Sequence, residues 1–271
     1  VKDNNEVPQR LKQTILTSVA AVCGIVLRSN LILKHEAQLT PEQYATIKEM
    51  LLYCLNYYTE SDTFAEENSS PGSGYSSTPR SEAAFALPKL FAITKDAELL
   101  PLIKQYSTDK NAVTRFGIIQ SINHLYPTQK ELFWEIVNER LVNETDWFTK
   151  SAVIGRLDNS KIFTTEPDRF LAAYELAKKE IFKMPEGRNS YLDSFLVMAL
   201  AFLRFTGNTR IKDVLQECLD TNLSIGTDLV FQAFEIIEPG NVYRNYSDAS
   251  DVEKSRKVLD MLMTLLEMCE R

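Results

Sequence analysis

From residue 81 to the C-terminus, apolar side chains recur every three or four positions, and short polar segments separate one such stretch from the next. The clearest stretches begin at Arg80, Asp96 and Asp109. Apolar residues at this spacing line one face of an α-helix, whereas a half-buried strand alternates apolar and polar positions. The pattern therefore predicts an all-α chain of antiparallel helix pairs, with about 11–12 helices.

The first 60 residues predict a helical hairpin. Apolar side chains recur between Pro8 and about Leu33, and they predict one long helix. Thr40 has the side chain of an N-cap, Pro41 suits the first turn, and Gln43 lies where a capping box needs it. We expect the buried face of the first helix to carry Leu11, Ile15, Val19, Val22 and Val26.

Residues 61–80 interrupt the helical pattern with Ser, Thr, Gly and Pro. This composition without periodicity is typical of a flexible loop or linker. Because such long loops are uncommon inside compact arrays, the segment is either functional or a boundary. We therefore expect a hairpin over residues 1–60, a linker over 61–80 and stacked helical repeats over 81–271, closed by a polar-faced capping helix from about Ser250.

The stretch from Arg188 to Thr206 is apolar on nearly every side, which predicts a helix buried between two neighbours. Helix pairs begin near residues 81, 111, 145, 188 and 225, so the repeat period is irregular. Tetratricopeptide units keep a fixed period of about 34 residues, whereas HEAT and armadillo units vary around 40 to 47. The spread predicts an α-solenoid of degenerate HEAT/armadillo-like repeats.

The segment from Ser81 to Leu157 resembles HEAT repeats. A helix ends before Asp96, a second helix contains Leu-Leu-Pro-Leu-Ile, and Asp109 with Val113-Thr-Arg115 opens the next pair. The resemblance implies that Asp109 and Arg115 join neighbouring repeats through ion pairs, although Thr114 splits the usual Val-Arg dipeptide. It also implies a surface that holds other molecules rather than a particular activity.

A second resemblance concerns Ser77-Thr-Pro-Arg80, which leads into an Ala-rich helix followed by helix pairs that begin with Asp. This arrangement is similar to the helical sensor regions that follow NTPase modules in bacterial defence proteins. The resemblance implies a regulatory module of a larger protein. The chain begins at Val1 rather than Met, which we also interpret as the start of a fragment.

The charge balance disfavours nucleic acid as a partner. Lys and Arg number 30 against 37 Asp and Glu, for a formal net charge of −7. Affinity for a phosphate backbone depends on clustered Lys and Arg that release counterions. The same acidity is compatible with an alternative function, a small inhibitor or immunity protein that binds a basic toxin.

The cysteines and the N-terminal apolar run indicate a cytoplasmic protein without a membrane span. Cys23, Cys54, Cys218 and Cys269 lie far apart in apolar segments, as buried thiols in a reducing compartment do. The run from Ile15 to Leu27 is too short to span a bilayer, is followed by Arg28 and lacks a cleavage site. We expect a buried first helix.

The sequence predicts no catalytic, metal or cofactor site. His35 and His124 are the two histidines, and neither has the partners of a metal motif at the required spacing. An enzymatic alternative is a HEAT-like nucleic-acid repair enzyme. In that alternative, a basic face would use the side chains of Trp134, Trp147, Arg115 and Asp146.

Two segments are candidates for contact with a protein partner, because Tyr and Arg are enriched at binding hot spots. The linker carries Phe64, Tyr75 and Arg80, and the turn after Glu238 carries the second group, which consists of Tyr243, Arg244 and Tyr246. The leading interpretation is a non-enzymatic protein-binding scaffold or sensor module.

Overall fold

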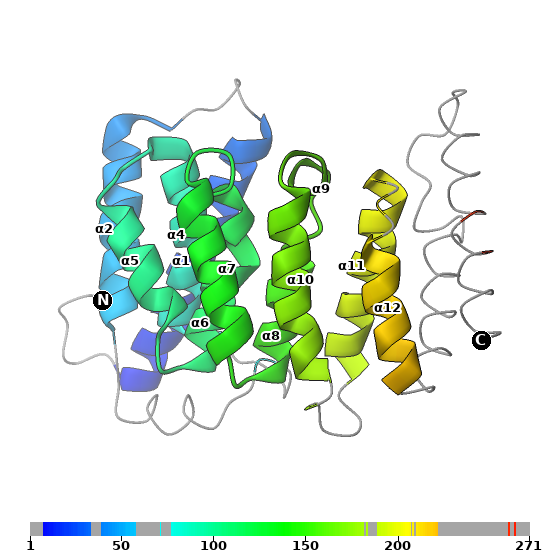
Figure 1. The fold of residues 1–271 in the computed structure, drawn as a ribbon. Helices are drawn as coiled ribbons and strands as arrows, with labels where there is room; N and C mark the ends of the chain where they lie inside the picture. The colour runs from blue at the N-terminus through cyan, green and yellow to red at the C-terminus, as the bar shows by residue number, and fades with distance from the viewer. Residues whose placement is uncertain are drawn as a thin grey trace. The chain divides into compact units, whose positions relative to one another are not determined.

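The computed structural model confirms the all-helical prediction (Figure 1). Its described residues are 8–33, 39–57, 71, 77–181, 183, 189–206, 208, 210–221, 260 and 263. These residues contain eleven α-helices and one 3-10 turn, η1, and no strand.

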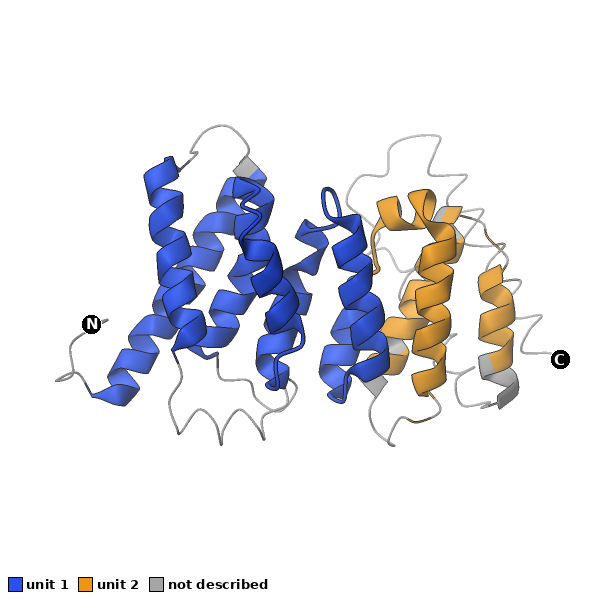
Figure 2. Cartoon of the chain, turned by 60° about the vertical axis from the view of Figure 1, so that its left-hand side comes forward, with its two compact units in different colours: residues 1–156 blue, residues 157–271 orange. Residues whose placement is uncertain are grey.

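Contacts between Cα atoms divide the chain into two compact units, residues 1–156 and residues 157–271 (Figure 2). The boundary follows the helix that ends at Gly155. The two N-terminal helices, which the sequence predicts as a separate hairpin over residues 1–60, lie in the same compact unit as the helices that follow them. Unit 1 contains α1 Gln9–Leu33, α2 Pro41–Asn56, α4 Pro79–Thr94, α5 Leu99–Ser107, α6 Ala112–Ser121, η1 Ile122–His124, α7 Lys130–Asn143 and α8 Trp147–Gly155.

The predicted start of α2 is confirmed in detail. The Thr40 N–H donates to Oε1 of Gln43 at 2.8 Å, and the Gln43 N–H donates back to Oγ1 of Thr40 at 3.3 Å. The helix has Pro41 in its first turn, where a missing N–H costs no hydrogen bond. Reciprocal capping satisfies two N–H groups that the helix itself leaves without partners.

The start of α4 lies inside the segment that sequence analysis assigned to the linker. Thr78 caps the helix, and Ser81 closes a capping box with it. Pro79 occupies the first turn, so residues 79 and 80 are helical rather than part of a loop. Ser, Thr and Pro are common both in linkers and at helix starts, so the composition that suggested a linker also fits the start of α4.

The buried face of α1 differs from the predicted one. Leu16, Ala20, Cys23 and Leu27 are buried, one position after the expected series, whereas Leu11 and Val22 are exposed. Because α1 is apolar on most sides, its periodicity alone does not decide which stripe packs inward.

Helix α4 is the centre of unit 1, and it packs against α1, α2 and α6. Its alanines at positions 83, 84 and 86 are fully buried, and these small side chains let neighbouring helices approach closely. The approach is closest at Gly117 of α6, where an added Cβ would lie 2.6 Å from the carbonyl oxygen of Ser81. Only a glycine fits between the two backbones at this distance.

Alternate helices of unit 1 pack side by side. Helix α4 contacts α6 and α6 contacts α8, while α5 contacts α7. Consecutive helices also contact each other, as α4 and α5, α5 and α6, and α7 and α8 do. The elements thus form two rows that share one core (Figure 1).

Unit 2 contains α9 Ser160–Thr165, α10 Pro167–Ile181, α11 Asn189–Thr206 and α12 Arg210–Thr221. Its core is aromatic: the rings of Phe170 and Phe202 stack at 4.4 Å, and those of Tyr174 and Phe195 stack at 4.0 Å. Leu196 and Leu200 of α11 are fully buried, which confirms the predicted burial of this helix. The predicted capping helix lies outside the described residues, apart from positions 260 and 263.

Candidate functional site

Of the six residues predicted to contact a partner, Arg80 is the one within the described part of the chain. It lies in the first turn of α4 and forms an ion pair with Asp109. Its Nη1 donates to the carbonyl oxygen of Leu55 at 3.3 Å, and its guanidinium lies 5.1 Å from the ring centroid of Tyr106. These contacts hold Arg80 inside unit 1. The other five residues, Phe64, Tyr75, Tyr243, Arg244 and Tyr246, lie outside the described residues.

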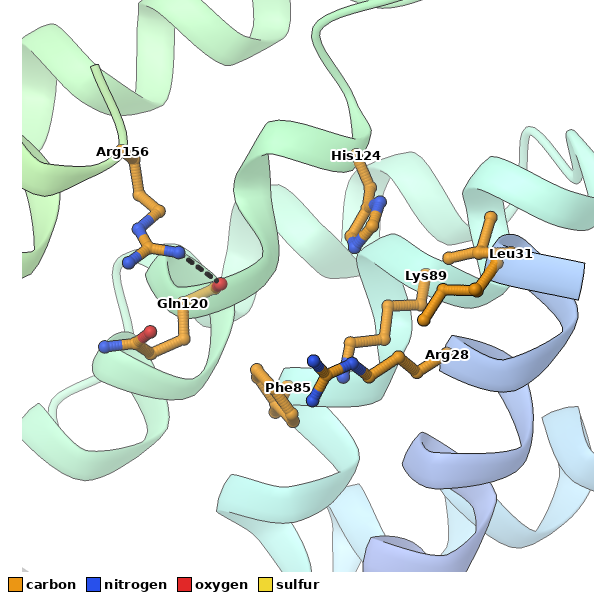
Figure 3. A pocket seen from close by; sticks show the side chains of 8 residues that line it. Arg28, Leu31, Phe85, Lys89, Gln120, His124 and Arg156 are labelled. Atoms are coloured by element: carbon orange, nitrogen blue, oxygen red, sulfur yellow. Dashed lines mark hydrogen bonds between the residues drawn. The ribbon is translucent and has the colours of Figure 1, made fainter. Parts of the chain in front are cut away.

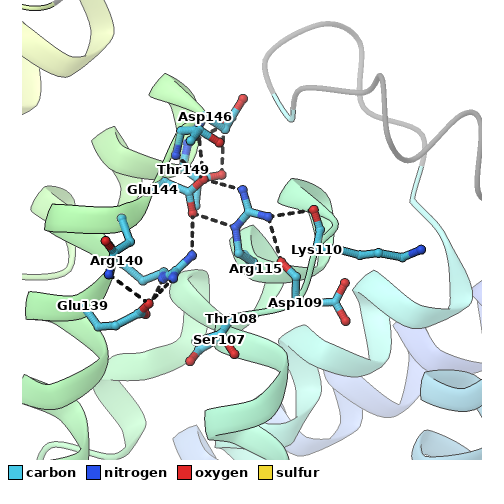
Figure 4. A network of polar contacts seen from close by, with 12 residues as sticks. Ser107, Thr108, Asp109, Lys110, Arg115, Glu139, Arg140, Glu144, Asp146 and Thr149 are labelled. Atoms are coloured by element: carbon cyan, nitrogen blue, oxygen red, sulfur yellow. Dashed lines mark hydrogen bonds and ion pairs between the residues drawn. The ribbon is translucent and has the colours of Figure 1, made fainter.

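Arg115 forms a second ion pair of the same kind (Figure 4). Its Nε donates to Oε2 of Glu144 at 2.7 Å, and its Nη2 pairs with the other carboxylate oxygen. Its Nη1 donates to the carbonyl oxygens of Asp109 and Lys110. Burial lowers the pKa of Arg115, but the hydrogen bonds to Glu144 together with the charges of Glu144, Asp146 and Asp109 outweigh burial and raise the pKa above its ordinary value.

These two ion pairs repeat one local design, which we call the polar ladder: Arg80 with Asp109 and Arg115 with Glu144. In both pairs the acid follows the base by 29 residues. Each acid stands two positions before the N-cap of the next helix, which is Asn111 for α6 and Asp146 for α8. The HEAT resemblance identified Asp109 and Arg115 as ion-pair residues but did not name their partners, Arg80 and Glu144. The segment after Glu144 repeats the order of residue types after Asp109, acid-x-Asn/Asp-x-x-Thr-base, and this repetition is the signal that could have identified Glu144.

Helix α1 carries a row of large apolar side chains on the surface of unit 1. Their spacings are close to whole numbers of helical turns, so they lie along one stripe of the helix. Val22 is 56% exposed and Ile25 is 64% exposed. We call the following residues the α1 row: Leu11, Val22, Ile25 and Ile32.

An apolar cavity of about 300 Å³ lies between α1 and α2. Ile15 and Val19 line it from α1, and Met50 and Tyr53 line it from α2. Met50 is itself exposed. The cavity and the α1 row together give unit 1 an apolar surface with a recess large enough for a side chain.

The stretch Gln9–Ile32 is also long and apolar enough to cross a membrane, with a mean hydropathy of 1.8. Within the described residues it is the one helix with these properties. The apolar run considered from sequence was shorter because it ended at Leu27, before Arg28. Core helices of soluble proteins and signal sequences near the N-terminus share this length and composition. Helix α1 packs against both α2 and α4.

A second cavity in unit 1, of about 340 Å³, is lined by basic side chains (Figure 3). Arg28 reaches it from α1, Lys89 from α4 and His124 from η1, and Arg156 lies on the opposite side. Nη1 of Arg156 donates to the carbonyl oxygen of Gln120 at 3.1 Å. None of the described residues that line this cavity is a carboxylate. We call it the basic pocket.

Lys89 and His124 have lowered pKa values in the basic pocket. Lys89 is 3% exposed, and burial together with the charge of Arg28 lowers its pKa to about 8, although Glu82 opposes this effect. Burial and the charge of Lys89 lower the pKa of His124. At neutral pH the pocket therefore holds three positive charges and a neutral imidazole.

The residues of the enzymatic alternative have structural contacts in unit 1. Trp134 is buried against Phe133, and the side chain of Asp146 caps α8 by accepting from the Thr149 N–H at 2.7 Å. Trp147 is half-buried, with Nζ of Lys150 at 4.5 Å from its ring centroid. The described residues contain no group of three or more His, Cys, Asp or Glu side chains that is suited to a metal ion.

Two of the four cysteines are in the described core. Cys23 and Cys54 are buried free thiols, as predicted. Burial raises the pKa of Cys54 to about 11, and the neighbouring Cys23 adds to this effect. Such a thiol is protonated at neutral pH and unreactive as a nucleophile.

No family model, curated protein or solved structure matches this chain.

Proposed function

We propose that this chain is a non-enzymatic helical-repeat module that binds another protein through the α1 row and the neighbouring apolar cavity. The observation that carries the proposal is the row itself, because four large apolar side chains are exposed along one helix. Exposed large apolar side chains that gather on one face often mark interaction sites on folded proteins.

The architecture supports the proposal through the arrangement of unit 1. Its alternate helices pack in rows, and the polar ladder joins α4 to the loop before α6 and α6 to the loop before α8. We infer that these elements are successive repeats of an α-solenoid. Solenoids expose extended surfaces for binding other macromolecules.

A protein fits this surface better than a membrane does. Helices that lie in a membrane interface have a polar face rich in Lys and Arg opposite their apolar face. The face of α1 opposite the row instead packs against α4 with buried residues such as Ala20 and Leu27. An apolar helix or loop of a partner would cover the row and place one side chain in the cavity.

The test compares wild-type protein with a Val22→Glu/Ile25→Glu double variant. Both side chains are exposed, so we expect the variant to fold with a Tm within about 2 °C of wild type, since surface substitutions change stability little. Proteins captured from cell extract by wild type are identified, purified and titrated by calorimetry. We expect at least a tenfold loss of affinity in the variant, because two charges would be buried at the interface.

Val142→Glu is the matched control, because Val142 of α7 is 57% exposed and lies outside the row. It should leave the affinity unchanged. The proposal would be refuted if Val142→Glu lost as much affinity as the double variant, or if the double variant bound the partner as tightly as wild type. It would also be refuted if wild type bound lipid vesicles instead of a purified protein.

A further inference from the structure

We propose that the basic pocket of unit 1 binds a phosphate group, either as the free dianion or as the terminal group of a small phosphate monoester. This inference concerns a different face of α1 from the proposed protein-binding row, apart from Ile32 at the rim, and it does not depend on that function. It rests on three features of the pocket: its charge, the chemistry of its donors and its volume.

The first feature is positive charge without a counter-charge. Arg28 and Lys89 form no hydrogen bond or ion pair with any other residue in the described part of the chain, and the face of Phe85 holds Nζ of Lys89 at 3.2 Å from the ring centroid. Most other buried basic side chains of unit 1, such as Arg115 and Arg140, pair with a carboxylate. In a chain of net charge −7, the placement of Arg28 and Lys89 in one cavity without a paired carboxylate is a local exception.

The second feature is the set of donors. Arg156 approaches the cavity from one side, and Arg28, Lys89 and His124 approach it from the other (Figure 3). Guanidinium groups bind phosphate oxygens through two parallel N–H donors, and a lysine ammonium adds a point charge. Three cations match a dianionic phosphate better than a single carboxylate, and a neutral His124 adds a hydrogen-bond donor or acceptor.

The third feature is size. The cavity volume of about 340 Å³ lies at the lower end of the range for small-molecule sites, which begins at about 300 Å³. This volume exceeds a phosphate ion and accommodates a small organic group beside it. Leu31 and Phe85 provide apolar surface for such a group.

The position of Lys89 gives the proposal a distinctive consequence. A buried ammonium without a paired carboxylate destabilises the folded protein, and the lowered pKa of Lys89 shows that the nearby charge of Glu82 does not offset the unfavourable burial. A bound phosphate would supply the missing charge. Lys89→Met should therefore raise the Tm of the phosphate-free protein while removing its response to phosphate, because methionine fills the same space without charge.

The experiment measures Tm and binding of the full chain at pH 7 and constant ionic strength. The probes are inorganic phosphate, adenosine monophosphate, acetate and a ten-nucleotide single strand. We expect saturating phosphate or the monoester to raise the wild-type Tm by about 2–4 °C, with no rise in acetate. The relative affinities for inorganic phosphate and the monoester then distinguish the two sources of the phosphate group.

Three variants complete the test. Lys89→Met and Arg28→Met should each weaken phosphate binding at least tenfold, and Arg28 is exposed, so its variant will fold even if the lysine variant does not. Lys104→Met is the control, because Lys104 is a surface lysine that pairs with Glu135 outside the pocket. Its phosphate response should equal that of wild type.

The proposal would be overturned if acetate raised the wild-type Tm as much as phosphate does, or if neither phosphate probe raised it. It would also be overturned if both pocket variants bound phosphate as tightly as wild type. Binding of a ten-nucleotide single strand without binding of the monoester would also overturn it, because the pocket would then belong to a nucleic-acid surface.

Discussion

At the scale of single residues, the carboxylate of Glu144 has the largest number of polar partners in the polar ladder. It accepts from Arg115 and Arg140 and from the backbone N–H groups of Thr145 and Asp146, each of the latter at 3.0 Å. Its side chain is fully buried. Removing one member of a buried ion pair leaves the other charge without compensation, which costs more than the pair itself contributes.

We predict that Glu144→Gln lowers the free energy of unfolding of unit 1 by about 3–5 kcal/mol, because Arg115 would remain buried without a full negative charge. Both tryptophans of the chain, Trp134 and Trp147, lie in unit 1, so their fluorescence during urea unfolding reports on this unit.

Glu135→Gln is the control variant whose loss of unfolding free energy is compared with that of Glu144→Gln. Glu135 pairs with Lys104 at 2.5 Å on the surface, and both side chains are about half exposed. Exposed pairs contribute up to about 1 kcal/mol. Equal losses in the two variants would show that burial of Glu144 is not what makes it important.

At the scale of elements, the contact between α4 and α6 determines how closely the central helices pack. An alanine at position 117 would place its Cβ 2.6 Å from the Ser81 carbonyl oxygen and 3.2 Å from the Phe85 nitrogen, and both atoms belong to the backbone of α4. A backbone cannot rotate away as a side chain can, so the helices must separate.

We predict that Gly117→Ala destabilises unit 1 by about 1–3 kcal/mol, although alanine favours an isolated helix by about 1 kcal/mol. Gly155→Ala in α8 is the matched change, because nothing lies within 4 Å of its added Cβ. It should be neutral or stabilising in the same urea experiment. A neutral Gly117→Ala would show that α4 and α6 are less closely packed than described here.

Local sequence signals predicted the elements well. The capping residues of α2 and the burial of α11 follow from short-range patterns, and both are present in the structure. The start of α4 was placed too late, because Thr78 and Pro79 suit a helix start as well as a loop. The inward face of α1 was assigned one residue early, because a helix that is apolar on most sides does not show which stripe its neighbours cover.

The candidate surfaces were not predictable in the same way. Arg28, Lys89, His124 and Arg156 come from four separate segments, and only the packing of α1, α4, η1 and the end of α8 brings them together. The α1 row was visible as apolar residues, but its exposure depends on which neighbours pack against α1. Arg80 was predicted from the sequence to contact a protein partner, and the structure shows it in an ion pair with Asp109 within the polar ladder.

At the scale of the whole molecule, we propose that unit 1 combines two functions on one scaffold: a protein-binding surface on α1 and a phosphate-binding pocket behind it. Both involve α1, whose buried face contributes to the core through Leu16 and Leu27. Arg28 follows Leu27 directly in the chain, so one turn of α1 supplies both a buried core residue, Leu27, and a residue that lines the basic pocket, Arg28.

The most direct test of the protein-binding proposal is hydrogen exchange of the full chain, measured with and without its purified protein partner. Amide exchange reports local opening, and a bound partner slows it where the helix is covered. We predict that exchange slows in peptides from residues 9–33 and 41–56, and that residues 130–143 are unchanged. Slower exchange confined to residues 61–80 or 238–246, with residues 9–33 unaffected, would contradict the proposal and place the partner on the segments indicated by sequence alone.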